Sequence, residues 1–485
     1  MDISNYGKNN RKTVAFLTLG CKVNSYETQG IKKLFEEEDY SVVEFHEKAD
    51  VYVINTCTVT NIADRKSRQM LHKARKMNED AIVMAVGCYA QAAGEQLKED
   101  EAIDIVVGNN RKKDIIHILK AYIDDNTIDS IIDISGNIEY EDLEILDVSE
   151  KTRAYIKIQD GCNQFCSYCI IPYARGRVRS RFAKSILREA KNLVEKGYQE
   201  IVLTGIHLSS YGIDFKKEGG DMETADVKAA DISVPEEEID GLDAFIREPG
   251  DYEPGTNYYL LDLIKQLDQI EGLKRIRLGS LEPRIVTESF VKGLSELETI
   301  CPHFHLSLQS GCNSTLKRMN RKYTTEVYLE KCLLLRKYFT NPAITTDIIV
   351  GFPGETAEEF EQTKEYLRNI QFAQMHIFKF SPRKGTRAAN MTDPVKEEIK
   401  AERSNELLHL AEEMSDTYKR SFIGKTEKLL VEEETLIEGE TYQIGHNERY
   451  LKLAVKSEKS LTNQILSVKV KEFLNKEMMF CESMD

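Results

Sequence analysis

Three closely spaced cysteines are the clearest sign of chemistry in this sequence. Cys162, Cys166 and Cys169 form a C-x3-C-x2-C run. Three thiolates can hold one face of a cubane iron–sulfur cluster, whose fourth iron then has no protein ligand. That iron could chelate S-adenosylmethionine, and one-electron reduction would release a 5′-deoxyadenosyl radical, with the protein supplying orientation. A structural zinc site is the alternative. It normally needs a fourth Cys or His, for which His207 is the nearest later candidate.

A second set of cysteines, Cys21, Cys57 and Cys88, has no local motif, but each follows directly on a predicted strand. All strands of an open parallel sheet end on the same edge. The three thiols are therefore expected to meet there and to hold a second iron–sulfur cluster, again with one open iron. Alternatively, they are buried cysteines that pack as small hydrophobic side chains. Core packing is the expectation for the other four: Cys301, Cys312, Cys332 and Cys481.

Two α/β series and a β-rich tail would position these cysteines. Continuous apolar runs separated by helical patterns predict a doubly wound parallel sheet, with strands at 14–19, 51–54, 81–86 and 103–107. A second series predicts a partial or complete parallel (β/α) barrel, with strands at 155–158, 200–203, 275–278, 303–308, 343–350 and 375–380. A long helix follows, with Asp393 as its N-cap and Pro394 as its first residue, and runs to about Phe422.

The tail predicts a small all-β barrel, because it contains strand-like β-branched runs at 428–431, 450–455 and 465–470. The fold class is therefore α/β with an all-β tail. The expected parts are an N-terminal α/β domain, a central barrel, a linking helix and a C-terminal β-barrel, at 1–140, 148–392, 393–422 and 423–485.

Length and composition narrow the class of protein. With 485 residues, 41% of them hydrophobic and 30% charged, the chain is expected to be globular with several domains. No apolar run reaches the roughly 18 residues that span a bilayer, and Met1–Asn10 lacks a signal-peptide core, so a cytoplasmic protein without membrane contact is expected. The net charge is −15, of which −10 falls on 214–256. This acidic stretch predicts a surface insertion into the barrel at about 212–255.

Two basic patches oppose the acidic total. Helical spacing over 61–77 places five basic side chains on one face: Arg65, Arg68, His72, Arg75 and Lys76. In 175–181 an alternating run would aim four guanidinium groups to one side of an extended chain: Arg175, Arg177, Arg179 and Arg181. Phosphate binding is the functional interpretation of both patches. A solvated helix face, or pairing of the arginines with carboxylates of the barrel, is the alternative.

The cysteine run and its expected barrel resemble the radical SAM superfamily, and the complete pattern resembles the radical SAM methylthiotransferases over nearly the whole chain except the insertion. The matching stretches are 18–24 (TLGCKVN), 55–60 (NTCTVT), 86–91 (VGCYAQ), 160–162 (DGC), 173–177 (YARGR), 351–356 (GFPGET) and 381–386 (SPRKGT). The tail is similar to the RNA-binding TRAM domain. The Gly-Cys-Lys-Val-Asn stretch is similar to the branch that acts on N6-threonylcarbamoyladenosine in tRNA, whereas the isopentenyladenosine branch tends to read Gly-Cys-Gln-Met-Asn.

The resemblance implies a transferase that methylthiolates carbon 2 of N6-threonylcarbamoyladenosine next to the anticodon, giving 2-methylthio-N6-threonylcarbamoyladenosine. It implies two 4Fe-4S clusters, one on each cysteine set, and S-adenosylmethionine as the source of both the radical and the methyl group. The S-adenosylmethionine contacts expected at the barrel rim are Tyr168, Ser280, Glu282 and Gln309.

The expected partners are the anticodon stem-loop of a tRNA, S-adenosylmethionine and an unidentified electron donor. Isopentenyladenosine in tRNA and an aspartate of a ribosomal protein are alternative substrates for the same chemistry. A non-catalytic iron–sulfur electron carrier is the alternative from another class of protein.

Overall fold

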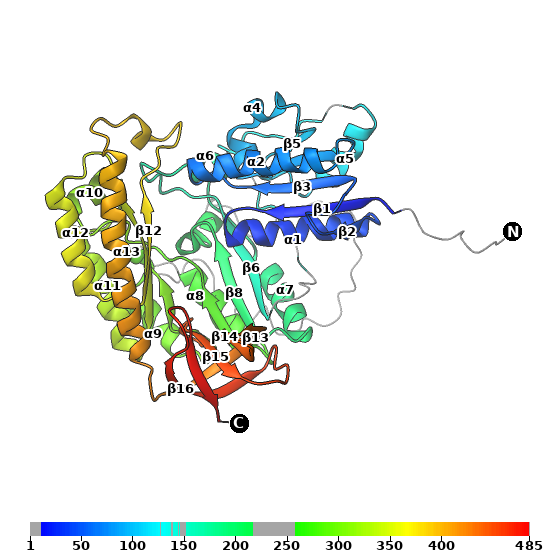
Figure 1. The fold of residues 1–485 in the computed structure, drawn as a ribbon. Helices are drawn as coiled ribbons and strands as arrows, with labels where there is room; N and C mark the ends of the chain where they lie inside the picture. Colours follow the sequence, from blue (N-terminus) through cyan, green and yellow to red (C-terminus); the bar gives the residue numbers. More distant parts are fainter. Residues whose placement is uncertain are drawn as a thin grey trace.

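The computed structural model describes residues 11–126, 128–136, 139–143, 145, 152–216 and 258–484. The predicted acidic insertion at about 212–255 lies outside the described residues from position 217 onward. An α/β domain and a small β-barrel lie at opposite ends of a central α/β body (Figure 1). Among the helices in the described ranges, none is both long enough and apolar enough to cross a membrane.

The N-terminal domain is a five-stranded parallel sheet. Its elements are β1 (Thr13–Thr18), α1 (Lys22–Glu37), β2 (Ser41–Val43), β3 (Val51–Thr56), α2 (Asn61–Met77), β4 (Ile82–Gly87), α3 (Cys88–Ala92), α4 (Gly94–Lys98), β5 (Ile105–Val107) and α5 (Ile115–Ile123). The strand order is β2-β1-β3-β4-β5. Successive residues of β3 belong to two different apolar clusters, one on each face of the sheet. The predicted doubly wound sheet is confirmed, and the short β2 is an addition that the sequence pattern did not indicate.

The central body is a partial barrel of two sheets. Its strands are β6 (Arg153–Asp160), β7 (Arg179–Ser180), β8 (Glu200–Gly205), β9 (Arg275–Leu278), β10 (His303–His305), β11 (Ala343–Val350) and β12 (Gln374–Lys379). The sheet orders are β7-β6-β8-β9 and β10-β11-β12, and single bridges such as Leu281 to Leu306 join them. All pairings are parallel except that of β7 with β6. The six predicted parallel strands are therefore all present.

Helices cover the outside of this partial barrel (Figure 1). They are α7 (Ala183–Glu195), α8 (Tyr258–Asp268), α9 (Glu288–Ser295), α10 (Asn313–Arg318), α11 (Thr325–Tyr338) and α12 (Ala357–Ile370). The short helix α6 (Ile171–Ala174) instead lies against α3 of the N-terminal domain. Short 3-10 helices are η1 (Leu208–Ser210), η2 (Ile213–Lys216), η4 (Pro283–Ile285) and η5 (Arg387–Asn390). The buried side chains of helices and strands form the largest apolar cluster of the described residues.

The long linking helix begins later than its sequence signals indicate. Helix α13 spans Glu397–Arg420, with Lys396 at its N-cap. Asp393 has a φ of 62°, outside the extended backbone of an N-cap residue, and its carbonyl accepts a hydrogen bond from the Gly354 N–H at 2.9 Å. The predicted start at Asp393 and Pro394 is therefore wrong by a few residues, because a tertiary contact holds Asp393 in a turn.

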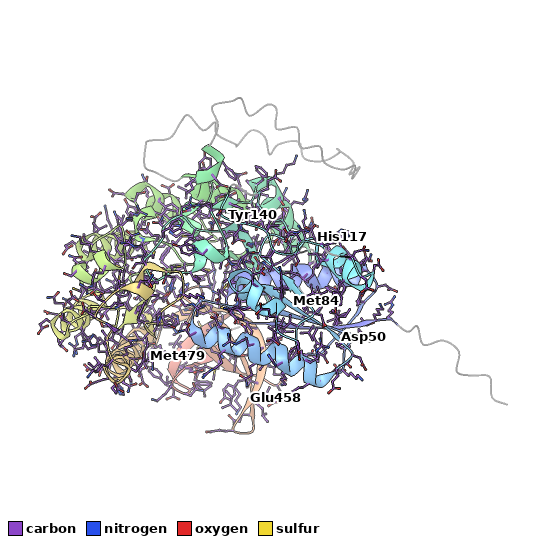
Figure 2. The ribbon with its side chains drawn as sticks, turned by 90° about the horizontal axis from the view of Figure 1, so that it is seen from above. Asp50, Met84, His117, Tyr140, Glu458 and Met479 are labelled. Atoms are coloured by element: carbon purple, nitrogen blue, oxygen red, sulfur yellow. The ribbon has the colours of Figure 1, made fainter. Side chains whose placement is uncertain are left out.

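The tail is a closed barrel of five strands, in the order β13-β14-β15-β17-β16. They are β13 (Thr426–Ile437), β14 (Glu440–His446), β15 (Lys452–Lys456), β16 (Ile465–Phe473) and β17 (Met479–Ser483). This barrel has a core of its own, separate from that of the N-terminal sheet: Met84 and Met479, labelled in Figure 2, are both fully buried, each in its own cluster. The predicted small all-β barrel is confirmed.

Two arginines of β9 attach the C-terminal barrel to the central body. Arg275 donates hydrogen bonds to the carbonyls of His446 (3.0 Å) and Lys428 (2.7 Å). Arg277 donates to the carbonyls of Glu448 (2.9 Å) and Asn447 (3.2 Å). The partners on the C-terminal barrel are thus main-chain oxygens rather than side chains.

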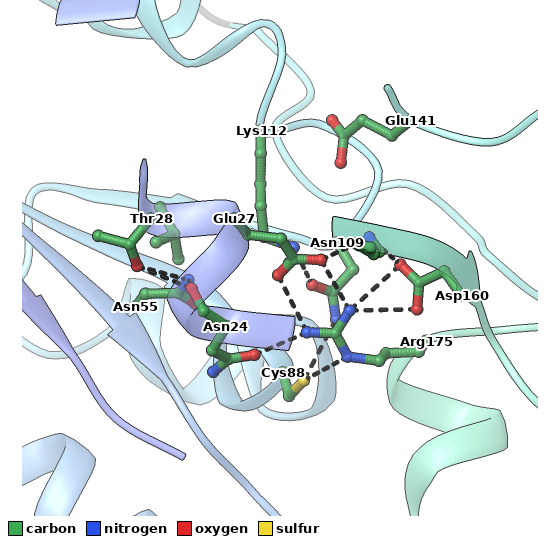
Figure 3. A network of polar contacts seen from close by, with 12 residues as sticks. Asn24, Glu27, Thr28, Asn55, Cys88, Asn109, Lys112, Glu141, Asp160 and Arg175 are labelled. Atoms are coloured by element: carbon green, nitrogen blue, oxygen red, sulfur yellow. Dashed lines mark hydrogen bonds and ion pairs between the residues drawn. The ribbon is translucent and has the colours of Figure 1, made fainter. Parts of the chain in front are cut away.

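Buried charges join the N-terminal domain to the central body (Figure 3). The Glu27 carboxylate of α1 is fully buried and pairs with Lys112 (3.0 Å), Lys157 of β6 (2.7 Å) and Arg175 after α6 (2.8 Å). Burial alone would raise the pKa of the Glu27 carboxyl, but these three cations outweigh it and hold the pKa well below its ordinary value. Two of the three cations belong to the central body, so this carboxylate links the two parts.

We expect Glu27→Gln to lower the free energy of unfolding by about 3–5 kcal/mol, because removing one partner leaves buried cations without their carboxylate. Differential scanning fluorimetry should show the loss as a lower midpoint of thermal unfolding. Glu37→Gln is the matched control, since Glu37 lies on the same helix and makes only an exposed ion pair with Lys33 (3.6 Å). Equal midpoints for the two variants would show that the buried network contributes no net stability.

Candidate active site

The C-x3-C-x2-C run lies at the carboxyl end of β6, the end at which barrel enzymes carry their active sites. The start of the loop packs closely against residues 176 and 177. A Cβ atom at Gly161 would lie 1.8 Å from the Arg177 carbonyl oxygen, so a side chain does not fit at this position. The Cys162 N–H donates a hydrogen bond to the Gly176 carbonyl at 3.0 Å. The Cys166 thiol interacts electrostatically with both Cys162 and Cys169. Burial raises the pKa of Cys162 to about 11 and that of Cys169 to about 12.

The structure brings Cys21, Cys57 and Cys88 together at one edge of the N-terminal sheet. Cys21 lies at the N-cap of α1, Cys57 follows β3, and Cys88 begins α3 after β4. A Cβ on Gly20, whose φ is 98°, would lie 2.8 Å from the Cys57 sulfur, so the backbone beside Cys21 passes directly against Cys57. Burial raises the pKa of Cys57 to about 11, and the Cys88 and Cys21 thiols add to the shift.

Both sets suit iron–sulfur clusters better than single metal ions. Within the described ranges, no group of three or more His, Cys, Asp or Glu side chains is arranged to hold one ion. A zinc site would place all its ligands around one ion, whereas the thiolates of a cubane cluster bind separate irons. His207, the candidate fourth zinc ligand, contacts the Ser210 hydroxyl through Nδ1 at 2.7 Å, and burial lowers its pKa to about 4. Its Nε2 has no hydrogen-bond partner among the described residues. Each set is a group of three thiols beside a closely approached glycine, and three thiols fit the donor set of a cluster.

Arg175 connects the two cysteine sets (Figure 3). Its Nε donates to the Cys88 sulfur at 3.1 Å, and its Nη2 donates to Asn24 Oδ1 at 2.7 Å. Its Nη1 lies 3.1 Å from both carboxylate oxygens of Asp160, two residues before Cys162. One buried guanidinium thus contacts a thiol of the N-terminal set and the strand end that carries the barrel set.

The prediction that the 175–181 arginines face phosphates is wrong for three of the four. Arg175, Arg179 and Arg181 are at most 3% exposed and pair with carboxylates of the chain itself. Arg181, for example, binds Glu189, which also accepts a hydrogen bond from Tyr26 of α1. Only Arg177 is exposed, and its guanidinium lies over the Phe165 ring, 4.6 Å from the centroid.

Arg321 is a contact to the barrel set that sequence reasoning missed. Its Nη1 donates to the Cys166 sulfur at 3.2 Å, and its Nε donates to the Tyr323 hydroxyl at 2.8 Å. Arg321 follows α10, far along the chain from the cysteine run, and no spacing rule links the two. Each cysteine set therefore has one arginine on one of its thiols: Arg175, which is fully buried, and Arg321, which is half-buried.

The predicted S-adenosylmethionine contacts occupy different surroundings. The Tyr168 ring packs edge-on against Phe352, with centroids 6.4 Å apart, and interacts electrostatically with Cys166 and Cys169. Glu282 is buried, pairs with Arg284 (2.8 Å) and interacts with Cys162. These two lie beside the cysteine run, where a bound cofactor could reach them.

The other two predicted contacts lack such a link to the cysteine run. Gln309 is buried at a strand end with a φ of 74°, and its main chain bonds to Asp347 and Ile349. Ser280 is exposed just beyond β9. Their role at the cofactor stays a prediction.

The basic face of α2 is partly engaged by the chain itself. The helix spans the predicted residues, but Arg68 bonds to the Tyr89 hydroxyl, His72 to Asp100 (2.9 Å) and Arg75 to Asp104. Arg65 and Lys76 remain exposed. The helix also docks onto the central body, because Arg383 bonds to Asn61 at its start (2.6 Å) and pairs with Asp64 (2.6 Å).

Lys22, directly after Cys21, extends from α1 toward the first strands of the barrel. Its ammonium lies 5.9 Å from the centroid of the Tyr155 ring on β6. Burial lowers the pKa of Lys22, and the neighbouring cations Arg153 and Arg277 lower it further. A cation next to the N-terminal cysteine set therefore faces the barrel interior.

Known families and structures resemble the chain over most of its length. The family described as "Uncharacterized protein family UPF0004" matches residues 13–108, and the radical SAM superfamily matches residues 156–367. A radical S-adenosylmethionine methyltransferase, TsrM, from Kitasatospora setae shares the fold, with a TM-score of 0.50 at 13% identity over 76% of this chain and 75% of that one.

Curated relatives cover nearly all of both sequences. The threonylcarbamoyladenosine tRNA methylthiotransferase MtaB of Bacillus subtilis is 38% identical over 94% of this chain and 93% of its own, and that of Aquifex aeolicus is 37% identical over 88% and 95%. A tRNA-2-methylthio-N(6)-dimethylallyladenosine synthase of Clostridium novyi is 35% identical over 86% and 84%. Identity at this level across almost full-length sequences, on a radical SAM fold with two three-cysteine sets, shows that the chain belongs to the radical SAM methylthiotransferase family of transferases.

Proposed function

We propose that this protein methylthiolates carbon 2 of N6-threonylcarbamoyladenosine next to the anticodon of tRNA, giving 2-methylthio-N6-threonylcarbamoyladenosine. The observation that carries the proposal is the pair of three-cysteine sets at adjoining strand ends, linked by Arg175. The relatives named for threonylcarbamoyladenosine support this substrate. The reaction would take place in the cytoplasm, with S-adenosylmethionine and a separate electron donor.

Cys162, Cys166 and Cys169 would hold one 4Fe-4S cluster, and Cys21, Cys57 and Cys88 a second one. When bound, these clusters and S-adenosylmethionine would supply hydrogen abstraction, sulfur and a methyl group at an unactivated C–H bond. Arg321 and Arg175 each donate an N–H to one thiol of a set and so restrict where that sulfur can lie. Tyr168 and Glu282, beside the cysteine run, would orient S-adenosylmethionine, as would Ser280 and Gln309 at neighbouring strand ends.

Different parts of the chain would hold the clusters and bind the RNA. We assign 1–140 to the second cluster, 148–392 to the radical chemistry, and 423–485 to RNA binding as a TRAM barrel. The segment 393–422 would connect the last two. The C-terminal barrel is held against β9, on the same body as the cysteine run, so RNA bound to it could reach the site.

Two clusters on two cysteine sets predict a defined iron content. After anaerobic reconstitution we expect about eight irons and eight sulfides per chain in the wild type, and about four of each in Cys57→Ala, since the barrel set is intact in that variant. Iron and sulfide analysis together with electron paramagnetic resonance would measure both. Cys332→Ala is the matched control, because Cys332 is equally buried but lies in the apolar core of α11. Equal cluster content in both variants would contradict a second cluster at Cys57.

The proposed substrate predicts a specific change in tRNA nucleosides. A strain without this gene should lose 2-methylthio-N6-threonylcarbamoyladenosine and keep its unmethylthiolated precursor, and the wild-type gene should restore the product, whereas the variant Cys166→Ala should not. Mass spectrometry of digested tRNA would follow both nucleosides. Loss of the methylthiolated isopentenyladenosine instead would transfer the assignment to that substrate, and unchanged nucleosides would point to a substrate outside tRNA.

A further inference from the structure

The barrel interior beside Lys22 carries charges that are compensated with one exception. Glu200 pairs with Arg277 (2.8 Å) and Arg275 (3.5 Å). Arg153 pairs with Glu432 of the C-terminal barrel at 3.0 Å. His305 and Asp347 pair at 3.3 Å. Lys22 makes no hydrogen bond or ion pair with any residue that the structure describes.

The position of Lys22 makes this exception informative. The residue follows Cys21, and its ammonium interacts with the charges of Arg153, Arg277 and Glu200, which belong to β6, β9 and the start of β8. It also influences His303 and His376, on β10 and β12. Its ammonium lies near the Tyr155 ring of β6, and its charge also acts on residues of the second sheet.

One strand on the same interior is exposed to solvent. Along β12, Met375 and Ile377 pack into the apolar core under the helices, so the alternating residues Gln374, His376 and Phe378 face the opposite side, the barrel interior. These three are exposed, and Phe378 keeps 48% of its surface accessible. An accessible aromatic ring and an uncompensated cation thus both lie on the interior side of the partial barrel, a pair of groups that suits a nucleobase bearing an anionic substituent.

We propose that Lys22 binds the carboxylate of the threonyl group on N6-threonylcarbamoyladenosine and selects this substrate over adenosines with uncharged N6 substituents. The inference rests on the proposed function and adds the group that recognises the substrate. A threonylcarbamoyl group ends in a free carboxylate, whereas a dimethylallyl group is apolar. Lys22 is exposed and has no carboxylate partner among the described residues, so it is available to a charged group of the substrate, whereas an analogue without that group makes no such pair.

A phosphate of the RNA could offer the same charge, so the test uses three anticodon stem-loops. They differ only in the adenosine next to the anticodon: threonylcarbamoyl adenosine, its methyl ester, or unmodified adenosine. Fluorescence anisotropy would measure their dissociation constants with the reconstituted enzyme, without reductant. The wild type should bind the acid about tenfold or more tightly than the ester. Lys22→Gln should lose this preference and bind all three alike, and Lys22→Arg should keep part of it.

The controls distinguish loss of the Lys22 contact from a general effect on folding and from failure of the proposed function. Lys33→Gln, on the same helix with an exposed ion pair, should match the wild type. Equal weakening of all three RNAs by Lys22→Gln would indicate a phosphate contact and overturn the proposal, as would equal wild-type affinity for acid and ester. The acid–ester contrast uses only the wild type, so equal affinities overturn the proposal even if the Lys22 variants lose their clusters. Where the wild type prefers the acid, Lys22→Arg and Lys22→Gln assign that preference to Lys22. If the wild-type enzyme fails to methylthiolate the acid-bearing RNA in a turnover assay, the proposed function fails separately.

Discussion

The buried guanidinium of Arg175 is the contact on which the arrangement of the site depends. A cation with no exposed surface is tolerated only when carboxylates and other acceptors surround it. Those acceptors come from two bodies: Glu27 and Asn24 from α1, and Asp160 from β6. The network is complete only when the N-terminal domain and the barrel are docked, and docking places Cys88 against the same guanidinium (Figure 3). The docking that brings the two cysteine sets toward each other therefore also completes the compensation of this charge.

The two cysteine sets are built alike although they arise differently. In each, a glycine with positive φ lets the main chain pass close to a neighbour, at Gly20 and Gly161, and one arginine donates to a thiol. The barrel set comes from one short loop, while the N-terminal set is collected from three strand ends. Sheet topology brings the cysteines of the N-terminal set together, whereas short sequence spacing brings those of the barrel set together.

Patterns that depend on topology were predictable from the sequence, and those that depend on tertiary partners were not. Apolar periodicity indicated both α/β series and the tail barrel, and strand ends indicated where Cys21, Cys57 and Cys88 meet. The alternating arginines looked like a phosphate-binding face, because a sequence does not show that Glu27, Asp160 and Glu189 converge on them. Arg321 gave no signal, because its contact with Cys166 joins residues far apart in the sequence. Lys22 belongs to the Gly-Cys-Lys-Val-Asn stretch, but the sequence does not show that its side chain extends toward Tyr155 of the barrel. Asp393 is a residue type that often caps helices, but its contact with Gly354 holds it in a turn, and the helix begins after it.

The attachment of the C-terminal barrel through main-chain oxygens has an evolutionary consequence. Because Arg275 and Arg277 recognise carbonyls near residues 428 and 446–448, most side chains of that barrel are not needed for these four hydrogen bonds. The outer surface of the C-terminal barrel can differ between related proteins while its attachment to β9 is kept. Homologues could in this way acquire preferences for different nucleic acids through drift in one small module, without disturbing the geometry of the chemistry beside it.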